Sequence, residues 1–351
     1  MRWLEKAGTP LGVMLTPILK REQTTLKALK GASFAIDASI EIHQFLALVR
    51  KRDGTLFTDT QGRVTSHLIG LFTRTSRLIA DFDMMPVFVF DGRPNPMKRS
   101  TIEIRRAAMK RAEIEYSEAV SKKDYAKAWS KAVMTGRVTG SILDDAKRLL
   151  TLMGIPWLEA LEDAEAQASF MAARGDVWAV GSKDYDCLLY GAPVLARFLT
   201  LTGREWLPVQ RRSRQLIPEL IKLSENLALL GISREQLVDL ALLIGTDFNQ
   251  GVNGIGPKKA LKLVREHGSI QQMPEEIRSK MTEDLNSVRQ IFLNPRVLEK
   301  YDLRRSPPDR DGLIEFLSGE RGFNRERVER LAERLIKTRE NMDAGLGQWL
   351  N

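Results

Sequence analysis

The sequence predicts an α/β protein in which helices flank a mostly parallel central sheet. Apolar runs at residues 33–36, 86–90 and 176–180 alternate with helical patterns such as 64–79 and 142–153. Short, continuous apolar runs are typical of strands that are covered on both faces, as in a parallel sheet. Strands that alternate with helices favour right-handed crossovers within one sheet. We therefore expect these strands to end at a common edge.

The composition indicates a soluble globular protein with an acidic partner. Of the 351 residues 43% are hydrophobic, and the formal net charge is +9. Lys and Arg gain free energy by displacing counterions from phosphates, so nucleic acid is one expected partner and a merely basic surface is the alternative. No segment approaches the roughly 18 apolar residues that span a membrane. We expect an intracellular, cytoplasmic monomer without membrane contact.

The single cysteine limits the chemistry further. Cys187 lies in the mostly apolar run 185–190. One cysteine excludes both a disulfide framework and a zinc site built from cysteines. We expect Cys187 in the core and not as a nucleophile.

Carboxylates follow each predicted strand. A fourth candidate strand at 154–158 precedes two further acids at the start of a helix. Ligands of an open parallel sheet bind beyond the carboxyl ends of its strands, so these acids should share one rim. The acids are Asp37, Asp91, Asp163, Glu165, Asp184 and Asp186.

Carboxylates at such close quarters need a counter-charge, and hard oxygen ligands select Mg²⁺ or Mn²⁺. Two such ions about 4 Å apart can generate a hydroxide nucleophile and stabilise the leaving oxygen of a phosphodiester. Any one aspartate alone is more often a helix N-cap or a loop residue. The acids by themselves are also compatible with a phosphatase or an RNA-cleaving domain.

The basic stretch 98–139 is too long for an ordinary strand-to-helix connection. It predicts one or two exposed helices, which act either as a lid or clamp over the site or as a solvated, salt-bridged pair. Basic residues gather at its start: Lys98, Arg99, Arg105, Arg106, Lys110 and Arg111.

A glycine-rich hairpin provides the second sharp signal. Residues 251–256 connect one predicted helix, 233–244 with Ser233 as N-cap, to the next. Backbone N–H groups at Gly254 and Gly256, with Lys258 and Lys259 in the following turn, suit a phosphate; an ordinary helix–helix turn is the alternative. Such a helix-hairpin-helix grips the DNA backbone without reading sequence.

The rest of the C-terminal part has a simpler pattern. Asp247 precedes the hairpin and adds a carboxylate near the rim. The chain after Leu199 is expected to be predominantly helical, including residues 307–341. Residues 343–351 are expected to be disordered.

Six stretches occur in the order and spacing of a known family: 35–38, 89–94, 163–167, 184–191, 245–247 and 254–260. The chain resembles the archaeal flap endonucleases of the 5′-nuclease superfamily, which are related to the XPG/Rad2 nucleases. The resemblance implies a PIN-like fold forming one domain over 1–342. Its parts are a nuclease region at about 8–97, a helical gateway and cap at 98–139, an internal nuclease region at 140–250, a helix-hairpin-helix at 233–270, C-terminal helices at 271–342 and a flexible tail at 343–351.

The resemblance further implies a 5′ flap endonuclease with 5′–3′ exonuclease activity that acts in Okazaki fragment maturation and repair. It implies two Mg²⁺ ions, with Mn²⁺ as an alternative. Lys98 and Arg105 match basic residues that orient the scissile phosphate and are catalytic together with Asp37, Asp91, Glu165 and Asp184. One metal matches Asp37, Asp91, Asp163 and Glu165, and the other matches Asp184, Asp186 and Asp247.

Several positions depart from the family pattern. Asp163 stands where the family has glutamate, with Glu162 beside it, and residues 1–7 precede the family's N-terminal glycine, Gly8. His43 replaces a tyrosine that stacks on a base. The DNA-binding residues implied are His43, Arg74, Arg77, Gly254, Gly256, Lys258 and Lys259, with K⁺ at the hairpin.

The tail resembles a motif that binds the sliding clamp PCNA, with anchors Leu346, Trp349 and Leu350 and with Asp343 in place of the leading glutamine. Two other functions remain open at this point. One is a branched-DNA binder without catalysis, and the other is a PIN-like ribonuclease.

Overall fold

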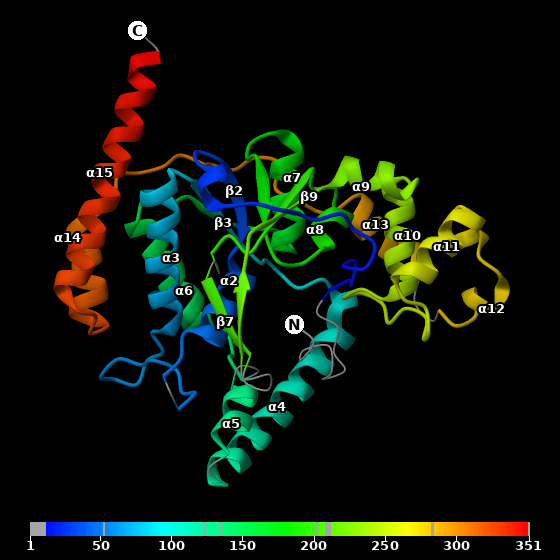
Figure 1. Cartoon of the computed structure of the whole chain (residues 1–351), viewed down its shortest axis with the longest axis horizontal. Helices are drawn as coiled ribbons and strands as arrows, with labels where there is room; N and C mark the ends of the chain where they lie inside the picture. The colour runs from blue at the N-terminus through cyan, green and yellow to red at the C-terminus, as the bar shows by residue number, and fades with distance from the viewer. Residues whose placement is uncertain are drawn as a thin grey trace.

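A mixed, mostly parallel sheet of seven strands forms the centre of the molecule (Figure 1). The computed structural model describes residues 12–349, apart from 52, 123, 133–134, 201–202, 208–211 and 282–283. The strand order is β1-β9-β6-β5-β2-β3-β4, and β9 pairs antiparallel with both β1 and β6 while the other neighbouring pairs are parallel. The strands are β1 (Glu22–Gln23), β2 (Ser33–Asp37), β3 (Met85–Phe90), β4 (Trp157–Glu159), β5 (Ala179–Gly181), β6 (Val194–Arg197) and β9 (Glu219–Lys222).

The sheet buries a different set of side chains on each face, because successive residues of a strand point in opposite directions. Phe34 and Ile36 of β2 enter one core, while Ala35 between them enters the other. The first core is covered by α2 (Ala38–Leu48), α3 (Ser66–Phe82), α6 (Gly140–Leu152), α14 (Arg310–Leu313), η4 (Ile314–Glu320) and α15 (Arg325–Trp349). The second is covered by α7 (Ala164–Arg174), α8 (Asp186–Leu189), α9 (Leu223–Leu230), α10 (Arg234–Ile244), α11 (Pro257–His267) and α13 (Leu285–Leu293).

The predicted gateway is a pair of helices that projects from the body (Figure 1). After η2 (Pro96–Lys98), α4 (Arg99–Ser121) and α5 (Tyr125–Ala132) pack against each other. Within α4 the buried residues are the small Ala112 and Ala119. The expectation of exposed helices over 98–139 is therefore confirmed.

The predicted helix-hairpin-helix is also present. Helix α10 begins with a capping box in which the Ser233 side chain accepts a bond from Gln236 N and the Gln236 side chain accepts one from Ser233 N. The turn leads into α11, which begins at Pro257 and packs on α10. Short helices η3 (Ile270–Gln272) and α12 (Glu275–Arg278) follow before α13.

Of two expectations for the chain after Leu199, one is confirmed and one was wrong. The region is predominantly helical as expected, although it also contains β9 and an antiparallel ribbon of β7 (Gly203–Leu207) and β8 (Arg212–Leu216) that we did not predict. Polar residues interrupt both ribbon strands, which therefore lack an apolar run. The tail expected to be disordered continues α15 as far as Trp349, and Figure 1 shows this helix extending away from the body. Leu350 and Gly8 lie outside the described residues.

Among the helices that the structure describes, none is both long and apolar enough to cross a membrane.

Candidate active site

The acids that follow the strands meet at the carboxyl edge of the sheet. Asp37 ends β2 and caps α2, with its Oδ1 accepting a bond from Ile40 N at 2.9 Å. Asp91 follows β3, and its Oδ1 accepts a bond of 2.9 Å from Ala164 N at the first turn of α7. Since β2 and β3 are parallel neighbours, both acids reach the same edge.

Asp163 and Glu165 enter the cluster from the start of α7. Asp163 Oδ1 accepts a bond of 2.6 Å from Lys98 Nζ, and its Oδ2 accepts one of 2.8 Å from Tyr190 OH. Glu165 Oε1 lies 3.3 Å from Ser182 Oγ, in the loop after β5. Both acids of this α7 turn therefore face the other carboxylates.

Glu162 points elsewhere, although it is the immediate neighbour of Asp163. Its two carboxylate oxygens accept bonds from Asn95 Nδ2 at 2.9 Å and from Arg296 Nη1 at 3.1 Å. Asp163, and not Glu162, is thus the acid next to Lys98.

Asp184, Asp186 and Asp247 complete the cluster. Val13 N donates to Asp186 Oδ1 at 3.0 Å, and Gly12 lies so close that a Cβ there would be 3.3 Å from the same oxygen. The glycine has φ +66°, a left-handed conformation that other residues rarely adopt. The N-terminal segment therefore packs directly on the acids, and this position needs glycine for both its space and its backbone.

The gateway contributes a second base to the cluster. Arg105 Nη2 donates to Asp247 Oδ1 at 2.5 Å, and Thr101 Oγ1 donates to the Asp247 carbonyl at 2.8 Å. Lys98, Thr101 and Arg105 are three or four residues apart and so share one face of the helix start. These hydrogen bonds connect the start of α4 to the acidic cluster.

Mutual repulsion shows how closely the acids lie. Burial and then Asp91 raise the pKa of Asp37 well above its usual value. Burial and then Asp184 do the same for Glu165. Burial, with Asp247 and Asp184, raises the pKa of Asp186 to about 7. Burial disfavours the charged Lys98, but Asp163 and Asp247 raise its pKa above the usual value.

The donor set fits hard divalent cations. The clustered groups are all carboxylates, and burial together with neighbouring acids raises the pKa values of Asp37, Glu165 and Asp186, so a nearby cation would favour their ionised form. Across the described residues, no three His, Cys, Asp or Glu side chains are placed to hold a metal ion as they stand. Asp163 and Asp247 are instead ion-paired with Lys98 and Arg105, so metal binding requires these side chains to move.

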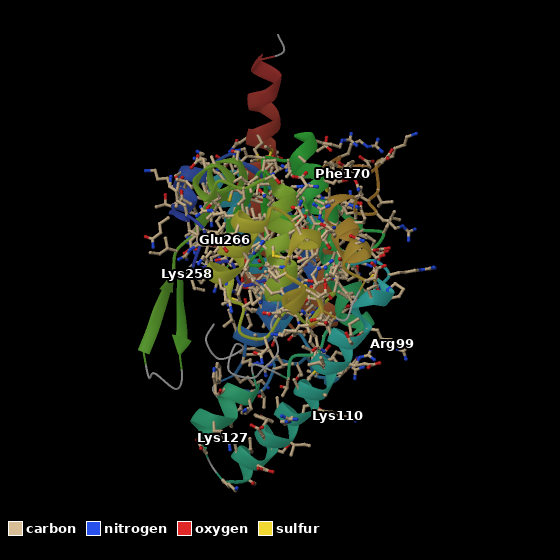
Figure 2. The ribbon with its side chains drawn as sticks, turned by 90° about the vertical axis from the view of Figure 1, so that its right-hand side faces the viewer. Arg99, Lys110, Lys127, Phe170, Lys258 and Glu266 are labelled. Carbon is tan, nitrogen blue, oxygen red and sulfur yellow. The ribbon has the colours of Figure 1, made fainter. Side chains whose placement is uncertain are left out.

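The hairpin before α11 presents an open backbone. A Cβ added at Gly254 or Gly256 would meet nothing within 4 Å, and Gly254 has φ +79°. Gly256 caps α11 without a side-chain bond, and it is exposed together with Lys258 and Lys259 of the first turn. Figure 2 shows Lys258 on the outer surface of the body.

Of the three other residues that the resemblance implied for DNA, His43 lies on α2 and the two arginines lie together on α3. His43 is exposed on α2, yet burial of part of its ring and the nearby Lys183 lower its pKa. Arg77, near the end of α3, lies 3.8 Å from Asp81, which also pairs with Arg334 of α15. Arg74 lies one helical turn before Arg77, and burial among the surrounding residues lowers its pKa. The structure places the two arginines on the helical layer shared by α3 and α15.

Several functional contacts were missed at the sequence level. Tyr190 binds Asp163, Ser182 approaches Glu165, and the buried Arg197 donates to the Lys183 carbonyl at 2.9 Å and to Tyr185 OH at 2.7 Å. Tyr190 lies one helical turn after Asp186, which is a signal that helical spacing could have revealed. Arg197 lies on a strand that we did not predict.

The chain is similar to known nucleases over nearly its whole length. Residues 11–112 match the XPG N-terminal domain and residues 154–247 match the XPG I-region. Flap endonuclease 1 of Methanothermobacter thermautotrophicus is 43% identical over 318 residues, which is 91% of this chain and 94% of that protein.

The chain is also similar to solved nuclease structures. Flap endonuclease-1 from Methanococcus jannaschii superposes with a TM-score of 0.75 at 38% identity, covering 94% of this chain and all of that one. The Holliday junction-resolving enzyme GEN1, in complex with product DNA, Mg²⁺ and Mn²⁺ ions, shares the fold with a TM-score of 0.55 at 19% identity, covering 87% of this chain and 70% of that one.

Proposed function

The chain belongs to the flap endonuclease 1 family of XPG nucleases, and we propose that it cuts 5′ flaps from branched DNA at the carboxylate cluster. One observation carries the assignment to this site. Acids from separate strand ends meet Lys98 and Arg105 at the foot of the gateway helices, which supports a site in which metal-binding acids and phosphate-binding bases would be adjacent.

We propose two Mg²⁺ ions as cofactors, with Mn²⁺ as an alternative. Asp37, Asp91, Asp163 and Glu165 would hold one ion, and Asp184, Asp186 and Asp247 the other. When bound, the ions would lower the pKa of the attacking water and stabilise charge on the leaving oxygen.

The protein's own residues bind and orient the substrate. Lys98 and Arg105 carry positive charge into the cluster and suit the non-bridging oxygens of the scissile phosphate. When DNA binds, Lys98 and Arg105 would release Asp163 and Asp247 and contact that phosphate instead. Both basic side chains would therefore have an anionic partner before and after binding. Residues 12–13 pack on Asp186 and so border that side of the site.

The proposed contacts with the downstream duplex lie outside the carboxylate cluster. We propose that the N–H groups before α11, Lys258 and Lys259 bind phosphates of the downstream duplex, with K⁺ at the hairpin. Arg74, Arg77 and His43 would contact further parts of the branched DNA. We also propose exonuclease activity, a monomeric enzyme inside the cell, and a role in replication and repair in which the tail binds a sliding clamp.

Product mapping on a panel of branched substrates tests the proposal. The wild type should release a 5′ flap only with Mg²⁺, and Asp184→Ala should lose cleavage while it binds the flap nearly as well without metal. Mg²⁺-dependent turnover by Asp184→Ala would remove Asp184 from the site. Equal cleavage of single-stranded RNA would favour a ribonuclease, and metal-independent binding without cleavage would favour a non-catalytic binder.

A further inference from the structure

The two carboxylate oxygens of Asp163 have different partners. Oδ1 accepts a bond of 2.6 Å from Lys98 Nζ, and Oδ2 accepts one of 2.8 Å from the phenol hydroxyl of Tyr190. The charges of Asp247 and Glu165 also act on the Lys98 ammonium, so Oδ1 faces the other acids. Because an ionised carboxylate can only accept, the hydroxyl is the donor in the second bond. Oδ2 is thus held by the buried phenol, independently of Lys98.

The Tyr190 side chain is fixed by its surroundings. It is buried, and its ring packs against Phe292 with the centroids 5.0 Å apart, while Phe292 meets Phe248 edge-on at 5.4 Å. The backbone is fixed as well, since Tyr190 N donates to the Asp186 carbonyl at 3.1 Å and the Tyr190 carbonyl accepts a bond of 3.2 Å from Arg234 Nη1. A hydroxyl held in this way can orient the acid that it contacts.

The short side chain of Asp163 makes this orientation important. Asp163 stands where the family has glutamate, so its carboxyl group lies one methylene nearer the backbone. Asp163 is also buried, and without the phenol its Oδ2 would lose this hydrogen bond in the protein interior. A carboxylate in that position would turn to find another partner. The bond to Tyr190 prevents this rotation and leaves Oδ1 directed at the cluster.

We infer that Tyr190 is a positioning residue of the metal site, whose hydroxyl holds Asp163 Oδ2 so that Oδ1 can contact the ion after Lys98 moves to the phosphate. The inference rests on the proposed function, because it takes Asp163 to be a metal ligand. Tyr190 lies one helical turn after Asp186 and therefore also connects the two proposed sets of ligands. Groups that hydrogen-bond to ligating side chains typically change metal affinity by about 10- to 100-fold.

Calorimetric titration of the full-length, DNA-free protein with Mg²⁺ tests the inference. Tyr190→Phe keeps the ring and removes the hydroxyl, and we expect it to bind Mg²⁺ about tenfold more weakly than the wild type. Adding Asp163→Glu to this variant should return the affinity nearly to that of the wild type, because the longer side chain reaches the cluster without the phenol. A longer acid would not rescue a tyrosine that only stabilises the fold.

Tyr301→Phe is the matched control. The Tyr301 hydroxyl donates to Asp176, which follows the C-cap of α7, whereas Asp163 is the N-cap of the same helix. This variant loses the same type of bond at the opposite end of α7 and should bind Mg²⁺ like the wild type. Wild-type affinity in Tyr190→Phe overturns the inference. So does a double variant that binds Mg²⁺ no more tightly than Tyr190→Phe.

Flap cleavage provides a second readout. For Tyr190→Phe the Mg²⁺ concentration that gives half-maximal cleavage should rise about tenfold, while kcat at saturating Mg²⁺ stays near that of the wild type. A lower kcat with an unchanged Mg²⁺ dependence would overturn the inference. If Tyr190→Phe does not fold, the double variant alone decides, since an affinity about tenfold below that of the wild type contradicts the rescue. Calorimetry needs no cleavage, so a wild type that fails to cut flaps would refute the proposed function separately.

Discussion

Asp163 and Asp247 are each paired with a base from the gateway, although both are proposed metal ligands. Lys98 Nζ and Arg105 Nη2 lie 2.6 and 2.5 Å from their carboxylates. On the proposed assignment, the bases and the metal ions would therefore compete for the same oxygens in the absence of DNA. This competition gives each base two successive partners, first a carboxylate and then a substrate phosphate.

Removing one base should therefore strengthen metal binding by the free protein. We expect Arg105→Gln to bind Mg²⁺ about three- to tenfold more tightly, since an ion pair of roughly 1 kcal/mol is no longer broken. Calorimetric titration without DNA measures this affinity. Arg106→Gln, the exposed neighbour on α4, controls for net charge and should change it much less. Unchanged or weaker binding by Arg105→Gln would contradict the competition.

His67 is a fully buried residue whose titration should affect stability. Neither ring nitrogen has a hydrogen-bond partner in the described part of the chain, and burial lowers its pKa to about 4. The unfolded chain binds this proton near pH 6.5, so stability is complete above pH 6.5 and is lost as the pH falls toward 4. The shift corresponds to about 3 kcal/mol.

The test replaces His67 with an uncharged side chain of similar size. The difference in free energy of unfolding between the wild type and His67→Leu should move by about 3 kcal/mol in favour of the variant between pH 6.5 and 4. Denaturant titrations at several pH values measure it, and acids elsewhere cancel in the difference. Parallel pH profiles would falsify the assignment of this titration to His67.

At the scale of elements, the hairpin before α11 should bind the DNA backbone without reading its sequence. We expect Lys258→Ala with Lys259→Ala to weaken flap binding equally for different sequences and to reduce the slope of log affinity against log salt by about 2. Fluorescence anisotropy at several salt concentrations measures both quantities. Lys27→Ala is the control, because Lys27 lies in η1 (Leu26–Leu29) before β2, at the opposite end of the sheet from the acids. A slope that is unchanged in the double variant would place the DNA elsewhere.

The elements differ in how far the sequence could predict them. Strands β2 and β3 are continuous apolar runs because helices cover both their faces, and the acids after them were therefore readable. Strand β9 and the β7–β8 ribbon alternate or mix polar residues, so local pattern did not distinguish them from loop or helix. The orientation of Glu162 depends on Arg296, 134 residues away, and no local pattern contains that contact.

At the scale of the whole molecule, the site depends on folding of the complete chain. Its acids come from residues 37 to 247, and the sheet brings them together between two separate cores. Helix α15 belongs to one of these cores through Val328, Ala332 and Leu335, whereas the same helix continues to Trp349. The core-forming residues of the C-terminal helix thus all precede its terminal segment.

This division leads to a prediction about the proposed clamp-binding tail. Deleting residues 343–351 should leave flap cleavage and thermal stability within error of the wild type, because the residues of α15 that enter the core precede the deletion. Stimulation of cleavage by a sliding clamp should be lost. Asp343→Gln, which restores the leading glutamine, should instead lower the clamp concentration needed for half-maximal stimulation, since it removes a charge from the contact. A deletion variant that the clamp still stimulates fully would place the clamp-binding surface on another part of the molecule.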